Sequence, residues 1–365
     1  MDFAILTSDT EIAVIAEEWR QLHNAIGTSP FSGFDYFDCW WRTTGNTNGR
    51  VLHIVTAREN GKLIGVLPLA VVRRKGFRVL QATGAEAFYQ ADILCANPEQ
   101  AQALWQAARN SKAYDFIHIR DVCPGSLDEQ ALNSFATAHE RNRAPYLKLE
   151  WKDAETYKAT LPRKVRTDLN RRLRRLEEKA PVKYTVCESL PLPEGIIEGM
   201  VKQKTAWCNE LGLQGMFDQP NVLAFFRLFA AEAAKRGELF LAWLQCGEDV
   251  IAHHLALRYG KKLISYVVSN DAAYFQYSPG HLANLNAISW ALEHGLEEFD
   301  HMQGDFAYKY QFANDVRECV EYTASTSFYG WLGAKLFIGR RDIRSKLGPY
   351  KRSLIGWYKK SFKRK

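Results

Sequence analysis

The sequence lacks the apolar segments that would anchor it in a membrane or export it. No stretch approaches the run of about 20 apolar residues that spans a bilayer. The first residues, Met1 to Asp9, contain neither a basic cluster nor a long apolar run, so we expect no signal peptide. These absences argue against a transmembrane protein and predict a cytoplasmic one.

Cysteine is sparse and has no motif spacing. The chain has 7 cysteines, an odd number, and no CxxC pair. A zinc site or a CxxC redox centre is therefore not expected, and we predict no metal cofactor. A disulfide framework is equally unexpected in a chain of 365 residues without a secretion signal. We expect reduced thiols in a reducing compartment.

Basic charge is concentrated at the C-terminal end. The net charge is +7, but residues 340–365 alone hold eleven Lys or Arg against one acid, Asp342. That segment therefore carries +10, and the remaining chain carries −3. A slightly acidic body argues against a protein built to wrap nucleic acid.

The C-terminal tail over 326–365, which contains this segment, is rich in aromatic side chains. They are interleaved with its basic residues and include Phe328, Tyr329, Trp331, Phe337, Tyr350, Trp357, Tyr358 and Phe362. Basic and aromatic residues together are typical of a segment that lies on an anionic membrane surface. We predict a helical membrane-surface tail over 326–365, with a disordered tail or a nucleic-acid contact as the alternatives.

The remaining chain predicts a mixed α/β fold in two parts. Its length suits two domains, and 47% hydrophobic with 24% charged residues is a globular composition. Helical periodicity marks 10–26, and an Asn60-Gly61 turn marks a hairpin. A helix over 127–143 closes the first half. We predict domains at 1–145 and 146–325, each with a hairpin of similar pattern.

Several sequence blocks follow one another in the second half. They are a basic helix at 163–177, a hairpin reaching Ala252, Tyr277-Ser278-Pro279-Gly280 before a helix, His294-Gly295-Leu296, and Gly304-Asp305-Phe306-Ala307-Tyr308-Lys309. This order resembles the GNAT-superfamily acetyltransferases of the cellulose-biosynthesis-associated type, which are related to the Fem-type aminoacyltransferases. The first half fits through Trp40-Trp41 and Val66 to Leu69. The resemblance implies two GNAT-like domains in tandem, and the tail from 326 lies outside it.

The turn at Ser278, Pro279 and Gly280, followed by His281, is the predicted binding site for the donor. A helix N-terminus favours phosphate through its free N–H groups and its dipole. In the GNAT resemblance this position implies acyl-coenzyme A as co-substrate. The simpler interpretation is a helix start with Ser as N-cap and Pro in the first turn.

Four residues are candidates for catalysis. His253 and His254 are strand neighbours on opposite faces, so one of them, for which we favour His254, could be the base, and packed histidines are the alternative. Asp305 is a helix N-cap, or it orients the acceptor amine or Lys309. The resemblance implies Tyr308 as the acid for the leaving thiolate. Lys309 holds a phosphate or carboxylate, or is solvated.

These features together predict an enzyme. The predicted reaction is acyl transfer from acyl-coenzyme A to the amine of a lipid or lipid-linked amino sugar, at the inner face of the cell membrane. The residues leave open whether an amine or a hydroxyl is acylated. The basic run Arg163 to Arg175 could bind coenzyme A phosphates, anionic lipid or RNA. The alternatives are therefore a Fem-type transferase using aminoacyl-tRNA and a non-catalytic lipid- or polysaccharide-binding adaptor.

Overall fold

The computed structural model describes residues 1–47, 49–88, 92–213 and 215–339, with 140 and 141 described for their backbone only. The described residues of the first half form six strands and four α-helices. These are β1 (Asp2–Leu6), α1 (Asp9–Ile26), α2 (Phe34–Trp40), β2 (Val51–Glu59), β3 (Lys62–Arg74), β4 (Phe77–Ala82), β5 (Leu94–Cys95), α3 (Pro98–Arg109), β6 (Phe116–Val122) and α4 (Leu127–Leu132).

The described residues of the second half add seven strands and six α-helices before residue 325. These are β7 (Thr137–Lys148), α5 (Ala154–Thr160), α6 (Arg163–Glu177), β8 (Val182–Cys187), α7 (Ile196–Leu211), α8 (Val222–Lys235), β9 (Leu239–Cys246), β10 (Asp249–Tyr259), β11 (Lys262–Asn270), α9 (Pro279–Glu293), β12 (Glu298–Asp300), α10 (Ala307–Tyr310) and β13 (Asp315–Ala324). A further helix covers 328–339.

Local sequence accounts for many of these boundaries. Helix α1 begins with a capping box, in which Ser8 accepts from the Glu11 N–H and Glu11 accepts from the Ser8 N–H. The β2–β3 hairpin turns at Asn60 and Gly61, which both have positive φ, 50° and 80°. This is the backbone that a two-residue hairpin of the primed type requires.

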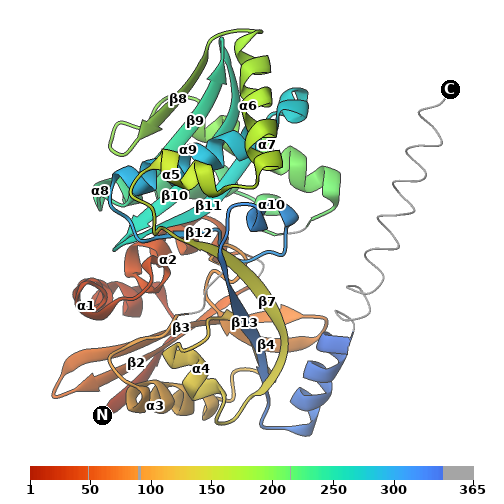
Figure 1. Cartoon of the computed structure of the whole chain (residues 1–365). Coiled ribbons are helices and arrows are strands. Elements are labelled where there is room, and N and C mark those ends of the chain that lie inside the picture. Colours follow the sequence, from red (N-terminus) through yellow and green to blue (C-terminus); the bar gives the residue numbers. More distant parts are fainter. Residues whose placement is uncertain (48, 89–91, 214, 340–365) are drawn as a thin grey trace.

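All the strands join one mixed sheet. The order is β1-β2-β3-β4-β6-β13-β7-β12-β11-β10-β9-β8, and β5 pairs with β3. The predicted mixed α/β class is confirmed. Strands β7 and β13 run from the upper half to the lower half in Figure 1 and connect the two parts of the sheet by antiparallel ladders.

The helix expected over 127–143 is wrong. Helix α4 ends at Leu132, and β7 starts at Thr137 and continues through residue 145. The reason is tertiary, because β7 pairs with β13, which lies about 170 residues later in the chain. Strand β13 also pairs with β6, so part of segment 146–325 is integrated into the sheet of the first half.

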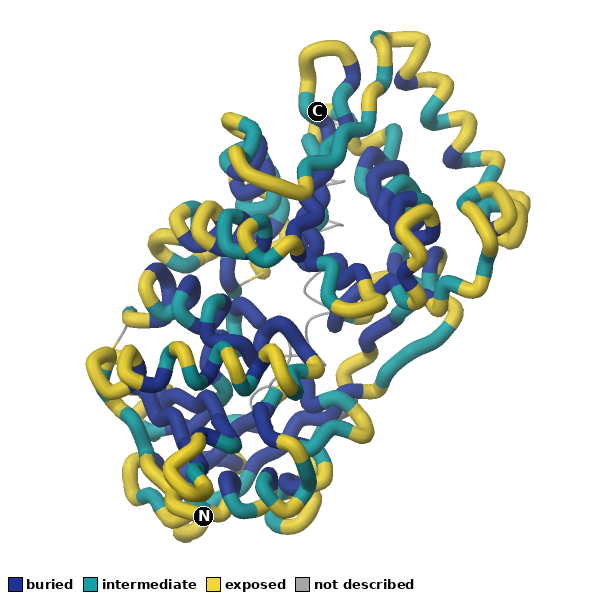
Figure 2. The backbone as a smooth tube through the Cα atoms, turned by 90° about the vertical axis from the view of Figure 1, so that its left-hand side faces the viewer, coloured by how far each residue is buried: buried dark blue, intermediate teal, exposed yellow. Residues whose placement is uncertain are grey.

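Four apolar cores of described residues hold the layers together, and the smallest contains Val72, Val79, Phe116 and Ala334. In the second half, α7 and α8 cover one face of the sheet, and α5, α6 and α9 cover the other. Helices α3 and α4 cover the sheet of the first half. The first core also joins the halves, because the Phe31 ring from the first half contacts the Tyr266 ring of β11 in a tilted arrangement, with centroids 5.9 Å apart. The Tyr266 hydroxyl donates to the Ala87 carbonyl at 2.7 Å. Buried backbone, dark blue in Figure 2, runs through both halves.

In the described part of the chain, no helix is both long and apolar enough to cross a bilayer. The tail predicted over 326–365 is described only as far as residue 339, and its basic residues from 340 onward lie outside the described residues.

Candidate active site

Two neighbouring parallel strands separate and open the sheet. Strands β11 and β12 pair only over Lys262 to Ile264, opposite Glu298 to Asp300. Beyond this point β11 continues to Asn270, whereas the chain after β12 turns away through 301–306 into α10. The separation exposes strand-edge groups to a ligand.

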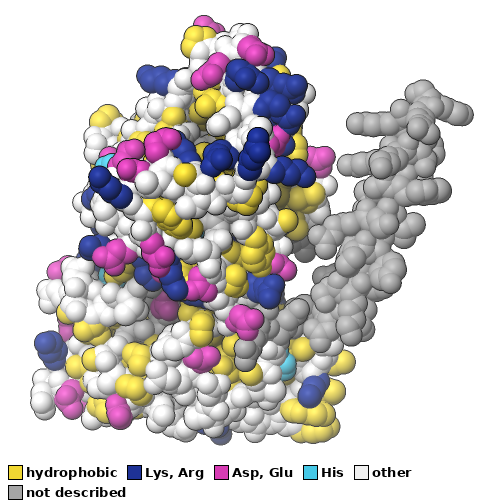
Figure 3. Space-filling model, viewed as in Figure 1, with side chains coloured by type: hydrophobic (Ala, Val, Ile, Leu, Met, Phe, Trp, Pro, Cys, Tyr) yellow, Lys and Arg dark blue, Asp and Glu magenta, His cyan; other side chains and the backbone are white. Residues whose placement is uncertain are grey.

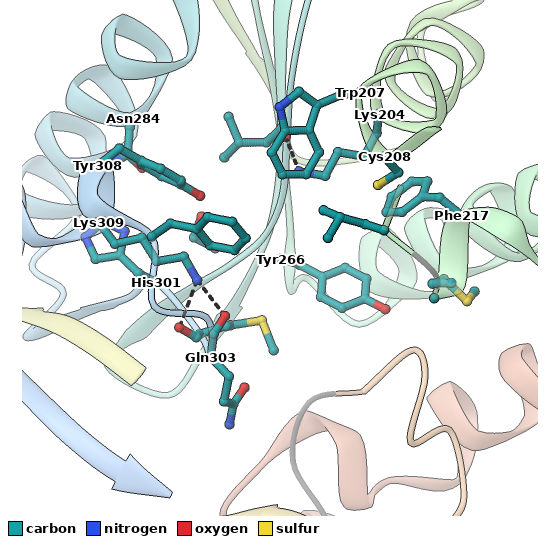
Figure 4. A pocket seen from close by; sticks show the side chains of 17 residues that line it. Lys204, Trp207, Cys208, Phe217, Tyr266, Asn284, His301, Gln303, Tyr308 and Lys309 are labelled. Atoms are coloured by element: carbon teal, nitrogen blue, oxygen red, sulfur yellow. Dashed lines mark hydrogen bonds between the residues drawn. The ribbon is translucent and has the colours of Figure 1, made fainter. Parts of the chain in front are cut away.

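A cavity of about 230 Å³ occupies this opening. Figure 4 shows Trp207 and Phe217 on one side and Asn284 and Tyr308 on the other. No Asp or Glu is found among the described residues that line it. Its charged groups are two lysines, Lys204 and Lys309, so the cavity favours neutral or anionic ligands.

Lys309 is buried, with 6% of its surface exposed. Its ammonium donates to the carbonyl oxygens of Gln303 at 2.6 Å and Met302 at 3.1 Å. Burial lowers the pKa of Lys309 to about 7; Asp300 opposes this shift, and Lys204 adds to it. The sequence predicted Lys309 as a site residue but did not predict that it titrates near neutral pH.

Lys204 is a site residue that the sequence analysis missed. Its ammonium donates to the Val268 carbonyl at 3.1 Å and lies 4.1 Å from the Trp207 ring centroid. Burial lowers the pKa of Lys204 to about 8. The available signal was its spacing on α7, because Met200 and Cys208 lie one turn to either side and are both buried.

His254 does not line the cavity itself, but it contacts Ser265, which does. Its side chain is fully buried between Phe240 and Phe299, and its Nε2 lies 2.8 Å from the Ser265 hydroxyl, which lines the cavity. Burial lowers the pKa of His254 to about 4. His253 points to the opposite face of the sheet and contacts Gln203 and Ser269.

His301 is another residue that the sequence analysis did not single out as a site residue. It lines the cavity directly after β12 and is buried. Burial, followed by repulsion from Lys309, lowers the pKa of His301 to about 3, so this imidazole is neutral at pH 7. Its position beside Asp300 at a strand end was the available signal.

Asp305 does not cap a helix, so the N-cap interpretation is wrong. The N-cap position of α10 belongs to Phe306, and the exposed Asp305 carboxylate accepts from the Tyr310 hydroxyl instead. Asp305 is also absent from the described lining of the cavity. Tyr308 does line the cavity, and its ring lies 6.0 Å from the His281 ring.

The Ser278–Gly280 turn lies at the start of α9, as predicted. Ser278 adopts φ 47°, Pro279 is the first helical residue, and the Ser278 side chain makes no capping hydrogen bond. A Cβ on Gly280 would lie 2.4 Å from the Asn270 Oδ1. Glycine at this position therefore allows α9 to approach the end of β11 closely.

A second cavity lies between this turn and α6. It has a volume of about 1070 Å³ and is lined by Ser278 and His281 together with α6 residues that include Arg163, Lys164 and Arg171. Asp168 is the one carboxylate among its described lining residues, and it pairs with Arg171 and Arg172. Figure 3 shows Lys and Arg side chains gathered over α6.

His281 connects the two cavities. It lines the basic cavity and faces Tyr308, which lines the lysine cavity. Asn284, one turn further along α9, also lines the lysine cavity. An extended ligand could therefore place its anionic end over α6 and its reactive end beside Lys309. No group of three His, Cys, Asp or Glu is arranged for a metal ion within the described residues.

Comparisons with known proteins agree with this geometry. Residues 163–310 match the acetyltransferase (GNAT) domain family, and this match supports an acyltransferase. No curated protein matches the chain in sequence.

Solved structures are similar over most of the chain. FemX aligns with a TM-score of 0.60 and 11% identity, covering 89% of this chain and 97% of FemX. The C-terminal domain of a putative lysylphosphatidylglycerol synthetase from Agrobacterium fabrum aligns at 0.57 and 11%, covering 89% and 96%. A tandem GNAT protein from the clavulanic acid biosynthesis pathway aligns at 0.50 and 14%, covering 89% and 99%. The fold is tandem GNAT-like, as predicted.

Proposed function

We propose that this chain is an N-acyltransferase that moves an acyl group from acyl-coenzyme A to an amine of a lipid or lipid-linked amino sugar. The observation that carries the proposal is the pair of cavities that meet at His281 and Tyr308. We further propose kinship with the cellulose-biosynthesis-associated acetyltransferases, on the block from Gly304 to Lys309.

The basic cavity suits the phosphates of coenzyme A. Its lining includes the Arg163 and Lys164 cations and the Ser278 hydroxyl, which makes no capping hydrogen bond. The N-terminus of the 15-residue helix α9 lies at the same place. Such groups bind a diphosphate through charge and N–H donors. The pantetheine arm would then extend past His281, and the thioester would lie in the lysine cavity.

The lysine cavity offers groups for each proton transfer. As the amine nitrogen attacks the carbonyl carbon, the carbon–sulfur bond breaks and the amine loses a proton. Neutral Lys309, with a pKa of about 7, can accept that proton, whereas His254, with a pKa of about 4, is a poor acceptor. Protonated Lys204 can stabilise the oxyanion, and Tyr308 can donate a proton to the departing sulfur.

We assign His254 and Asp305 to positioning. His254 orients the Ser265 hydroxyl at the cavity wall. The Asp305 carboxylate accepts a hydrogen bond from the hydroxyl of Tyr310, which lies two residues beyond Tyr308. This contact supports the short helix α10.

The site of action that we propose is the inner face of the cell membrane, reached by a cytoplasmic protein. The helix over 328–339 exposes Phe328 (77%), Trp331 (48%) and Leu336 (46%) to solvent. The eleven basic residues of 340–365 follow it in the sequence. An apolar helix face next to positive charge suits an anionic lipid surface.

The donor proposal is tested by titrating the protein calorimetrically with coenzyme A and with a long-chain acyl-coenzyme A. We expect micromolar binding that falls at least about tenfold when Arg163→Gln and Lys164→Gln are combined. Arg175→Gln is the matched control, because Arg175 lies on the same helix but not in the lining. If the unchanged protein bound neither coenzyme A nor the acyl-coenzyme A, the donor assignment would be contradicted.

Aminoacyl-tRNA is the second candidate donor, and the observation that favours it is the density of basic residues on α6. Transfer RNA would then bind with a steep salt dependence, because its phosphates release counterions. The same Arg163→Gln and Lys164→Gln variant would reduce that slope.

A further inference from the structure

A third cavity lies where the two halves of the chain meet. It has a volume of about 460 Å³ and is lined mainly by β4, the segment that follows β4, and β6 from the first half, and by residues 215–219, which precede α8, from the second half. Gly215 and Met216 line both this cavity and the lysine cavity, so the two adjoin. Nothing in the proposed mechanism uses it.

Two arginines in this cavity have no carboxylate partner among the described side chains. The Arg74 guanidinium donates to the Gln81 Oε1 at 3.1 Å, and Arg120 donates to the Ala85 carbonyl at 2.8 Å. Both arginines keep solvent-exposed surface. Partial burial, and then repulsion from Arg120, lowers the pKa of Arg74, and attraction to Glu86 opposes this shift. Two cations held close together attract an anion strongly.

The acids in the cavity are already partnered. The Glu86 carboxylate pairs with Arg50 at 2.8 Å. Asp121 accepts from the Asn142 amide at 2.8 Å, and Glu321 contacts His118. Glu86 attracts Arg74 and Asp121 attracts Arg120 at longer range, but neither carboxylate forms an ion pair with these arginines among the described side chains.

Gln81 supplies an independent sign of a missing ligand. Its side chain is 2% exposed, and its Nε2 has no acceptor within the described structure. The Oε1 already accepts from Arg74, which fixes the direction of the amide. A buried donor without an acceptor costs about 1–3 kcal/mol, so a bound acceptor would stabilise this site.

An apolar surface borders the same cavity. Phe337, from the helix over 328–339, lines it. The inner side of this helix packs closely, because a Cβ on Gly330 would lie 1.8 Å from the Asp115 carbonyl and one on Gly333 would lie 2.7 Å from Phe77. The outer side exposes Phe328, Trp331 and Leu336, as described above.

We propose that this cavity is a binding subsite for the phosphate of a membrane phospholipid headgroup. Arg74, Arg120 and the Gln81 amide would bind the phosphate oxygens, and the adjoining helix would contact the acyl chains. The geometry fits a phosphate because guanidinium and amide N–H groups match its oxygens. The inference rests on the proposed function only in making this lipid the acceptor of the acyl group.

The test is direct binding to the full chain, without any donor present. The probes are short-chain phosphatidylglycerol below its micelle concentration, the matching diacylglycerol, and inorganic phosphate. We expect the phospholipid to bind at least about tenfold more tightly than either partial probe, since each supplies one of the two contacts.

Variants separate the phosphate site from general charge. Arg120→Gln and Gln81→Glu should each weaken phospholipid binding about tenfold or more. Arg73→Gln is the control, because Arg73 precedes Arg74 on β3 but does not line the cavity. The proposal is overturned if both variants bind like the unchanged protein, or if inorganic phosphate binds as tightly as the phospholipid. Coenzyme A titration of the same variants distinguishes this failure from failure of the proposed enzyme.

Discussion

The Lys309 ammonium lies 2.6 Å from the carbonyl oxygen of Gln303 and is held there without a carboxylate in the cavity. The Gln303 and Met302 carbonyls belong to the segment that follows β12, where Met302 adopts φ 56°. The position of this ammonium is therefore set by a turn of the backbone. A lysine bound by carbonyl dipoles can lose its proton more easily than one bound by a negative charge.

Lys309→Met tests the catalytic assignment of this group. We expect kcat to fall about 100-fold or more, because a general base contributes about that much. At pH 10, where most of the cost of neutralising the buried lysine is gone, unfolding should also become easier by about 1–3 kcal/mol, because two buried carbonyls lose their donor. Steady-state kinetics and urea denaturation measure the two effects. The exposed Lys235→Met serves as the control, and equal activity of both variants would remove Lys309 from the mechanism.

Stability should depend on pH through the same residue. Lys309 has a folded-state pKa of about 7 against an ordinary 10.5, so between these values the unfolded chain binds more protons. The free energy of unfolding therefore rises with pH across this window. Relative to Lys309→Met, the unchanged protein should gain stability from pH 7 to pH 10 in urea titrations. A difference that stays flat with pH would contradict the lowered pKa.

Tyr308→Phe should lower kcat about 100-fold while leaving coenzyme A affinity unchanged, because it removes only the hydroxyl that donates to the thiolate. Tyr329→Phe is the control, since Tyr329 is exposed on the helix over 328–339 and does not line the cavity. A donor with a better leaving thiol should restore much of the rate. Equal rates for the two variants would exclude Tyr308 as the acid.

Gly280→Ala tests why glycine starts α9. The added Cβ would meet the Asn270 Oδ1 at 2.4 Å, so we expect a loss of about 1–3 kcal/mol in unfolding free energy. Combination with Asn270→Ala should recover most of that loss, since the Asn270 Oδ1 has no partner among the described atoms. Thermal unfolding of the unchanged protein, the two single variants and the double variant measures the coupling free energy between the two positions. Additive losses would mean that the close contact is not the cause.

The exposed helix face should drive binding to lipid vesicles. Trp331→Ser should weaken partition into anionic vesicles about tenfold at high salt, where the charges of 340–365 are screened and apolar burial dominates. Val14→Ser is the control, because Val14 is 79% exposed on the distant helix α1. Cosedimentation measures the partition, and equal binding of the two variants would exclude this face.

The sequence predicted elements whose signals are local, and it failed where distant partners decide the structure. The basic helix α6, the β2–β3 hairpin and the start of α9 follow from periodicity, Asn-Gly and Ser-Pro. Strand β7 does not, because its partner β13 lies far along the chain. Tyr308 and Lys309 were predicted as site residues from the sequence. Lys204 was missed, because it lies far from them in the chain and meets them only in the cavity that opens where β11 and β12 separate.

The continuous sheet also has a consequence for the choice of substrate. The lysine cavity and the arginine cavity adjoin at Gly215 and Met216, and the halves that hold them are joined by backbone ladders of β7 and β13. The halves are therefore joined by backbone hydrogen bonds rather than by a single linker, and the sheet sets the interval between the arginines of one cavity and Lys309 in the other. An acceptor that occupies both must match this interval, so the protein would select its substrate by molecular length as well as by charge.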